Sequence, residues 1–132
     1  MTQEEEKNLL LKDLCTRLPY GVRYRHFTWN DEYGETYIVA QIYSINIDGY
    51  VKNCHDDETV YIDNVRPYLF PLSSMTGEQK KEYQYITERW MNDPAYSISD
   101  SIDWLNKHHF DYRGLIEKGL ALEAPKEMYK TE

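Results

Sequence analysis

Two short stretches of the chain contain the side-chain types that bind metal ions or transfer protons. The denser stretch consists of five consecutive residues, Cys54, His55, Asp56, Asp57 and Glu58. Zinc needs ligands that converge tetrahedrally, whereas neighbours on an extended chain point to opposite sides. The stretch also lacks the alternating acids, the central glycine and the distal glutamate of a helix-loop-helix calcium site. We therefore interpret it as a polar turn, and keep His55, Asp56 and Asp57 as candidates for an alternative polar site.

The second stretch contains His108, His109 and Asp111, close to the end of a predicted helix. Adjacent residues on a helix diverge by about 100° around its axis, so the two histidines are not placed to chelate one ion as a simple pair. Either histidine could act as a general base near neutral pH, but a histidine in the last turn of a helix also interacts favourably with its carbonyl end. We favour the structural interpretation and assign the three residues to the same alternative site.

Known catalytic motifs do not occur in the sequence. It contains no G-x-S-x-G nucleophile elbow and no glycine-rich phosphate loop. Ser73 and Ser74 precede a predicted helix, and we expect them to shape its entry. We therefore favour a protein without enzymatic activity, metal or cofactor, and keep a small metal-dependent hydrolase as the alternative.

The aromatic content is unusual, because aromatic residues make up 14% of the chain and thirteen of them are tyrosines. Tyrosine suits a half-buried strand, where its ring packs and its hydroxyl stays hydrated. Rigid rings with a polar tip also suit a recognition surface, and small barrels often bind peptides on such a face. Five residues of the predicted sheet are therefore candidates for partner binding: Tyr24, Trp29, Tyr37, Tyr43 and Tyr61.

Capping patterns predict where the helices begin. Thr2 with Glu5, and Thr76 with Gln79, form capping boxes. Leucines at helical spacing after the first box predict an amphipathic helix over residues 2–18.

The β region is predicted between these boxes, over residues 20–70. Its β-branched and aromatic residues alternate with short polar clusters, and the predicted strands cover residues 21–28, 36–45, 50–53 and 59–62. Both alternating sets of the second strand are apolar, so we expect that strand to be covered on both faces. We expect VRPYLFPL to leave the last strand through a short helical turn, with Pro67 and Pro71 preventing any further ladder.

The helical region is predicted over residues 76–120. After the helix that begins at Thr76, we expect a second helix capped by Ser99 or Asp100. A third, short helix over residues 112–118 is expected to have Asp111 as its cap and Gly119 as its left-handed stop. The tail, residues 123–132, is expected to be frayed.

Length and charge limit the classes of function. The 132 residues suffice for one domain, and the formal net charge is −8. Because negative charge repels phosphate backbones and anionic lipids, we expect no direct nucleic-acid or membrane binding. An acidic mimic of nucleic acid is a further alternative.

The N-terminal residues have acids where a secretory signal has bases. The contexts of Cys15 and Cys54 give no reason to expect a disulfide. Both observations favour a cytoplasmic protein.

Three stretches, LKDLCTRLPYGV, VRPYLFPLSSMTGEQKKEY and HFDYRGLIEKGLALEAP, resemble a recurring family of short uncharacterised proteins from gut anaerobes and their mobile elements and prophages. The resemblance covers both ends of the chain and the exit from the predicted sheet. Because this family has no assigned reaction, the resemblance implies a mobile-element or phage setting and supplies no catalytic residues.

The sequence thus predicts a single α+β domain over residues 1–132. An N-terminal helix and a C-terminal helical section flank a small antiparallel β-sheet or SH3-like barrel. We expect a non-enzymatic interaction module that holds a protein partner on the aromatic sheet face or in the groove between the sheet and the C-terminal helices. Partner identity and oligomeric state stay open at this stage.

Overall fold

The computed structural model describes residues 1–30, 32, 34–53 and 59–129. In this part of the chain the helices are α1 (Gln3–Arg17), α2 (Gly77–Asn92) and α3 (Ser99–Lys107). The strands are β1 (Arg23–Asn30), β2 (Gly34–Ile45), β3 (Tyr50–Asn53), β4 (Thr59–Tyr61), β5 (Val65–Pro71), β6 (Phe110–Asp111) and β7 (Leu122–Glu123). Short 3-10 helices, η1 (Leu18–Tyr20), η2 (Ile62–Asn64) and η3 (Leu72–Ser74), link some of them.

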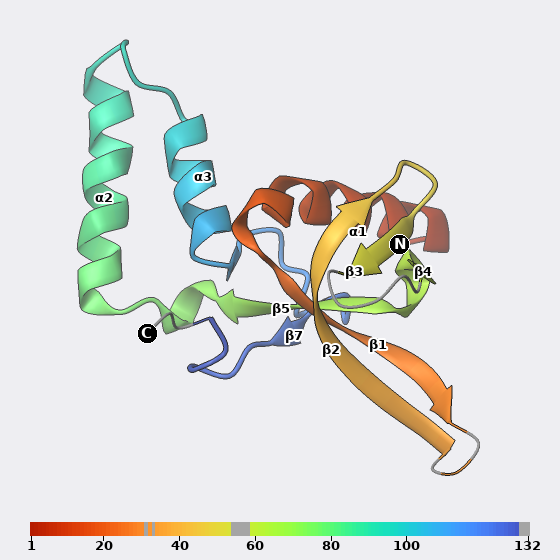
Figure 1. Cartoon of the computed structure of the whole chain (residues 1–132). Coiled ribbons are helices and arrows are strands. Elements are labelled where there is room, and N and C mark those ends of the chain that lie inside the picture. The colour runs from red at the N-terminus through yellow and green to blue at the C-terminus, as the bar shows by residue number, and fades with distance from the viewer. Residues whose placement is uncertain (31, 33, 54–58, 130–132) are drawn as a thin grey trace.

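The strands form an open, mostly antiparallel sheet in the order β4-β3-β2-β1-β5-β6, with β7 also paired to β5. The pairs from β4 to β5 are antiparallel, and β6 and β7 both run parallel to β5. The predicted α+β class is therefore confirmed, and of the two predicted architectures the chain adopts the open sheet. The long β1–β2 ribbon extends beyond the rest of the sheet in Figure 1.

Helix α1 lies across one face of the sheet (Figure 1). The capping box between Thr2 and Glu5 forms as predicted, and Leu10 and Leu14 are buried. These leucines pack in the main hydrophobic core, whose members from the sheet include Tyr24. Burial of such side chains, worth roughly 1.5–3 kcal/mol each, holds the helix on the sheet.

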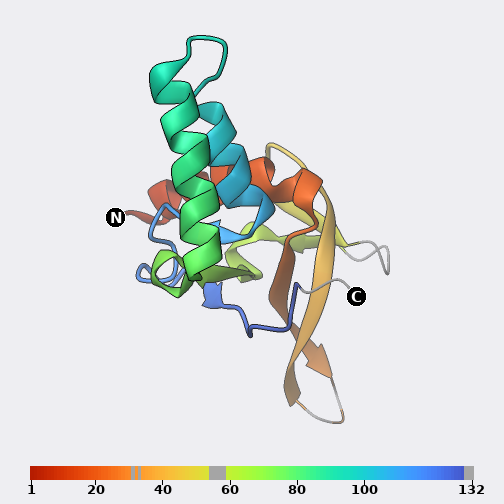
Figure 2. The ribbon, with the colours of Figure 1, turned by 90° about the vertical axis from the view of Figure 1, so that its left-hand side faces the viewer.

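Helices α2 and α3 form an antiparallel pair that stands away from the sheet, as Figures 1 and 2 both show. The capping box between Thr76 and Gln79 starts α2, and none of its residues is fully buried. At the base of the pair, Trp104 of α3 packs with Phe110 in a second, smaller core. Within the described residues, no helix combines the length and the apolarity that a membrane crossing requires.

The prediction that Pro67 and Pro71 prevent any further ladder is wrong, because both belong to strand β5. A short helical turn does form at the end of this stretch, as η3, which begins at Leu72. Pro67 lies opposite Tyr24 in the last register pair between β1 and β5, and Pro71 is the last residue of its strand. A proline is tolerated where its nitrogen faces no ladder acceptor, and both residues lie at ladder ends.

The prediction that the second strand is covered on both faces is also wrong. In β2, Ala40 and Ile42 are buried, whereas Val39 and Tyr43 are exposed. The exposure of Val39 and Tyr43 shows that the described residues leave this side of β2 open, so apolar content alone does not predict which faces of a strand are covered.

The C-terminal section differs from the prediction at three points. Helix α3 begins at Ser99, but its N-cap is Ile98, without a side-chain cap. Residues 112–118 form turns in place of a helix, although the Asp111 carboxylate accepts hydrogen bonds from the backbone of Leu115 and Ile116 at 2.9 and 3.0 Å. The expected stop forms, because Gly119 has a φ of 73° and the Leu120 amide donates to the Leu115 carbonyl.

The third difference concerns the tail, which is not frayed over its described part, residues 123–129. Glu123 belongs to β7, which pairs with β5, and Ala124 is buried. The Tyr129 hydroxyl accepts from the backbone amide of Arg23 at 2.8 Å and donates to the carbonyl of Tyr68 at 2.8 Å. The tail therefore belongs to the folded sheet.

Candidate functional site

The predicted aromatic residues do not share one surface. Tyr24 is fully buried in the main core, and Tyr43 is 70% exposed on the open side of β2. Tyr61 is partly buried, with the Lys7 ammonium 5.2 Å from its ring centre. Trp29 and Tyr37 lie in β1 and β2, opposite Glu35 and Phe27, and their side chains fall outside the described part. Tyr24 is therefore no longer a candidate contact residue.

The structure also does not bring the described residues of the alternative polar site together at one place. His55, Asp56 and Asp57 lie outside the described residues. His108 and His109 line one cleft, whereas Asp111 is bound to the backbone of the following turn and does not line it. Within the described ranges, no group of three or more histidine, cysteine or acidic side chains is placed to hold a metal ion.

The cleft that contains the two histidines lies where the sheet meets α2 and α3, and its volume is about 440 Å³. The end of β5, η3, the start of α2, the end of α3 and the C-terminal tail converge there (Figure 1). Its lining residues are Phe70, Ser74, Thr76, Gln79, Lys107, His108, His109, Phe110, Lys126 and Tyr129. The cleft lies between the sheet and the C-terminal helices, where a partner groove was expected.

Three aromatic rings form the floor of the cleft. Phe70 of β5 lies opposite Phe110 of β6 in parallel register, with 6.2 Å between ring centres. Tyr129 from the tail meets Phe70 edge to face at 5.9 Å. Edge-to-face pairs at this distance are favourable, and they give the cleft a firm apolar base.

His109 has the most constrained geometry in the cleft. It is the one described non-glycine residue with a positive φ, 63°, and its ring stacks on Tyr129 with 3.6 Å between centres. Its Nδ1 atom is buried without a hydrogen-bond partner. Burial, together with the nearby charges of Arg17, His108 and Arg23, lowers the pKa of His109 to about 4. The ring is therefore neutral at pH 7.

His108 sits beside it and is only partly buried. Its ring centre is 4.4 Å from that of Trp104. Burial lowers the pKa of His108, Glu82 opposes this shift, and Lys107 adds to it. His108 is thus also biased towards the neutral form.

The fixed charges in the lining come from two lysines. Lys107 ends α3 and Lys126 belongs to the tail, and both side chains are exposed. No lining residue among those described is Asp or Glu. The ion pairs that the described residues form involve Asp13 with Arg17 and Arg113, so both lysines are unpaired in that part of the chain. The cleft is therefore locally cationic on an acidic protein.

The hydroxyl groups in the lining are committed to structural hydrogen bonds. Ser74 Oγ donates to the Pro71 carbonyl at 2.6 Å, and the Thr76 side chain accepts from the Gln79 amide at 3.2 Å. Neither histidine ring makes a hydrogen bond to another described residue. A nucleophile activated by an adjacent base requires such a contact, and the described residues of the cleft do not form one.

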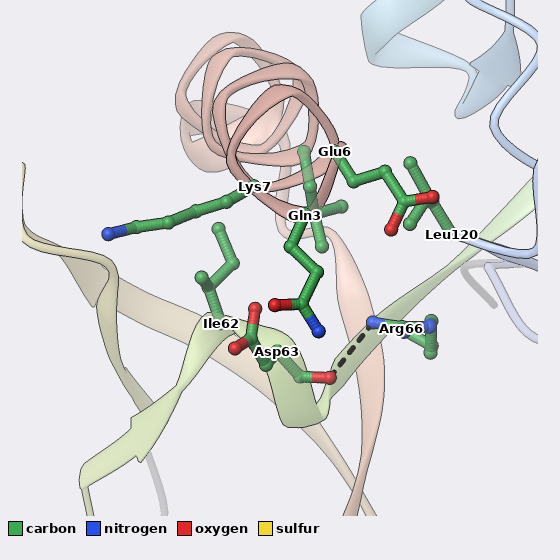
Figure 3. A pocket seen from close by; sticks show the side chains of 8 residues that line it. Gln3, Glu6, Lys7, Ile62, Asp63, Arg66 and Leu120 are labelled. Carbon is green, nitrogen blue, oxygen red and sulfur yellow. Dashed lines mark hydrogen bonds between the residues drawn. The ribbon is translucent and has the colours of Figure 1, made fainter. Parts of the chain in front are cut away.

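A second, smaller depression of about 190 Å³ lies between α1 and η2. Its lining contains both signs of charge, Glu6 and Asp63 together with Lys7 and Arg66, and the Lys7 side chain extends away from the other three (Figure 3). The Arg66 guanidinium donates to the carbonyls of Asp63 and Val65 at 3.2 and 2.8 Å. Because its main cation is already engaged and its charges are mixed, we do not select it as the functional site.

Only His108 and His109 of the ten described lining residues belonged to the predicted sites. Four of the other eight give the cleft its charge and much of its aromatic floor: Phe70, Lys107, Lys126 and Tyr129. Phe70 was assigned to a chain exit, and the tail that contains Lys126 and Tyr129 was expected to be frayed. No local signal predicted that the tail docks, because Tyr129 is held by Arg23 and Tyr68, which are far from it in the sequence.

No protein-family model, curated protein or solved structure matches this chain. The assignment of function therefore depends on the site itself.

Proposed function

We propose that the chain is a protein-interaction module without catalytic activity, and that it holds its partner in the cleft. One observation supports this most directly: an aromatic floor faces a hollow of about 440 Å³ whose rim contains two unpaired lysines. Ligand sites typically combine a mostly apolar lining with a few polar groups in roughly 300–1,000 Å³. The open side of β2, with exposed Val39 and Tyr43, offers a second contact area on the same protein.

The hydrogen bonds in the cleft support binding over catalysis. Ser74 and Thr76 serve the backbone, and the two histidines are neutral and lack an orienting carboxylate among the described residues. Aromatic anchors with a polar rim are the usual components of protein interfaces.

A blocking substitution tests the proposal. Ser74→Trp places an indole in the cleft from an exposed position, whereas Ser73→Trp adds the same group to the neighbouring exposed residue of η3, which does not line the cleft. Tagged wild-type and variant proteins are used for affinity capture from the cell that encodes the chain, followed by quantitative mass spectrometry. We expect one set of proteins to be captured by the wild type and by Ser73→Trp and to be lost with Ser74→Trp.

The proposal fails if all three proteins capture the same set, or if nothing is enriched above an untagged control. Circular dichroism of both tryptophan variants guards against misfolding as the cause of a loss.

A further inference from the structure

We infer that the cleft binds an acidic segment of a polypeptide that also contains an aromatic or large apolar side chain. This inference rests on the proposed function and names the chemistry of the partner. It depends on the two lysines at the rim, Lys107 and Lys126, and on the aromatic rings of the floor. It also depends on the opposing dipoles of the two helix ends that line the cleft.

The rim selects negative charge. Lys107 and Lys126 come from separate elements, α3 and the tail, and have no ion pair within the described residues. Among the described residues, the lining of the cleft holds these two ammonium groups and no carboxylate, although the whole chain has 23 acidic residues and 15 basic ones. The charge of the lining is therefore complementary to the carboxylates of a partner.

The two helix ends at the cleft do not decide the charge preference. The N-terminus of α2, at Thr76, has positive dipole character, and the C-terminus of α3, at Lys107, has negative dipole character. Because both ends line the same cleft, their effects oppose each other, and the lysine ammonium groups set the sign of the potential.

The floor requires an apolar group beside the acid. Phe70 and Tyr129 are partly exposed, and they meet at 5.9 Å between ring centres above the buried Phe110. A side chain laid on these rings removes apolar surface from water, at about 25 cal/mol per Å². Acid alone would leave this surface hydrated.

A peptide fits better than a nucleic acid. A polyphosphate would bring many charges to a protein whose formal net charge is −8, and the resulting repulsion would extend well beyond the cleft. A short acidic segment brings a few carboxylates, which two lysines can match locally.

The experiment uses the full chain and four fluorescent probes in anisotropy titrations. The main probe is a fluorescein-labelled octapeptide of alternating glutamate and phenylalanine. In two related peptides lysine replaces glutamate or alanine replaces phenylalanine, and the fourth probe is a single-stranded oligothymidylate. We expect saturable binding of the main probe, weaker binding of the alanine peptide, and no binding of the lysine peptide or the oligonucleotide.

Two charge variants test the rim. Lys107→Gln/Lys126→Gln removes two charges at the cleft, and Lys80→Gln/Lys81→Gln removes two charges from exposed positions of α2 outside it. We expect the first variant to weaken binding of the main probe by about tenfold or more, and the second by less than about twofold.

Several results would overturn the inference. Two of them concern the probes: the lysine peptide binds as tightly as the main probe, or the oligonucleotide binds more tightly than it. The other two are that both charge variants lose the same affinity for the main probe, or that the main probe does not bind up to about 1 mM. If these occur while Ser74→Trp still abolishes capture of cellular partners, the cleft is the binding site and the acidic class is wrong. If Ser74→Trp also leaves capture unchanged, the proposed function fails as well.

Discussion

Tyr129 is the residue that holds the C-terminal tail on the sheet. The ladder between β1 and β5 ends at the pair Tyr24 and Pro67. The residues that would pair next, Arg23 and Tyr68, are joined through the Tyr129 hydroxyl, which accepts from the Arg23 amide and donates to the Tyr68 carbonyl. Burial raises the pKa of Tyr129 well above its usual value, so the hydroxyl keeps its proton and continues to donate. The Tyr129 hydroxyl thus supplies the hydrogen bonds that the backbones of Arg23 and Tyr68 do not make to each other.

Removal of this hydroxyl by Tyr129→Phe leaves the Arg23 amide and the Tyr68 carbonyl without this partner. We expect the free energy of unfolding to fall by about 1 kcal/mol, the usual net contribution of a hydrogen bond, because the Arg23 amide is exposed and the Tyr68 carbonyl is only partly buried. Urea denaturation followed by circular dichroism measures the change. Tyr43→Phe, at a residue that is 70% exposed, is the control and should alter stability by less than about 0.5 kcal/mol. Equal stabilities of the two variants would contradict this role of Tyr129.

His109 makes stability depend on pH in a defined window. Its pKa is about 4 in the folded chain and about 6.5 when unfolded, so the unfolded chain binds the proton more readily between these values. The contribution of His109 to stability is complete above pH 6.5, falls as the pH drops towards 4, and changes no further below that. The loss is up to about 3 kcal/mol, from about 1.4 kcal/mol per pKa unit.

The variant His109→Asn isolates this effect, because asparagine tolerates the positive φ of this position and does not titrate. We expect the difference in unfolding free energy between wild type and variant to shrink or reverse between pH 6.5 and 4, measured by urea denaturation at each pH. Parallel pH curves for the two proteins would show that His109 is not the titrating group.

At the scale of elements, a buried ion-pair network joins α1 to the segment that follows α3. The Asp13 carboxylate accepts from Arg17 Nε at 2.7 Å and from Arg113 Nε at 3.1 Å. Arg17 Nη2 also donates to the Phe110 carbonyl at 2.7 Å. Because Asp13 and Arg17 are fully buried, this network fixes the strand that supplies the cleft floor.

Asp13→Asn removes the one negative charge between these two arginines. We expect a loss of about 3–5 kcal/mol, since a buried cation would then lack its partner. Glu4→Gln makes the same chemical change at an exposed position of α1 and should cost less than about 0.5 kcal/mol. Thermal and urea unfolding compare the two proteins, and similar stabilities would mean that the network does not hold the elements together.

Helix starts and short strands were predicted correctly where residues close in the sequence determine them. Both capping boxes formed as predicted, and strand β3 has the predicted bounds, Tyr50–Asn53. Strand β5 was missed because a proline such as Pro67 normally interrupts a strand and is tolerated only where the ladder ends. The sequence alone does not show that the ladder between β1 and β5 ends at Pro67.

At the scale of the whole molecule, the surface is larger than a compact shape would give. A chain of 15.9 kDa is expected to expose roughly 7,400 Å², and this protein exposes 8675 Å². The excess fits the projecting α2–α3 pair and the long β1–β2 ribbon seen in Figures 1 and 2. Extra area of this kind is available for contact with other molecules.

The cleft was predictable only in outline, as a groove between sheet and helices. Its wall combines Ser74, Lys107 and Lys126, which are far apart in the sequence and meet only through the fold. The histidines were identified because their chemistry is distinctive, whereas the lysines became informative only once the fold showed that they line one cleft together, without a carboxylate among its described lining residues.

The position of the tail bears on how the protein is handled. Lys126 and Tyr129 form part of the cleft wall, so a tag fused after residue 132 would begin within a few residues of the cleft. In Figure 1 the N-terminus lies on the other side of the molecule from the base of the α2–α3 pair. Purification handles and labels therefore belong at the N-terminus, and shortening the chain before Lys126 would remove one side of the cleft.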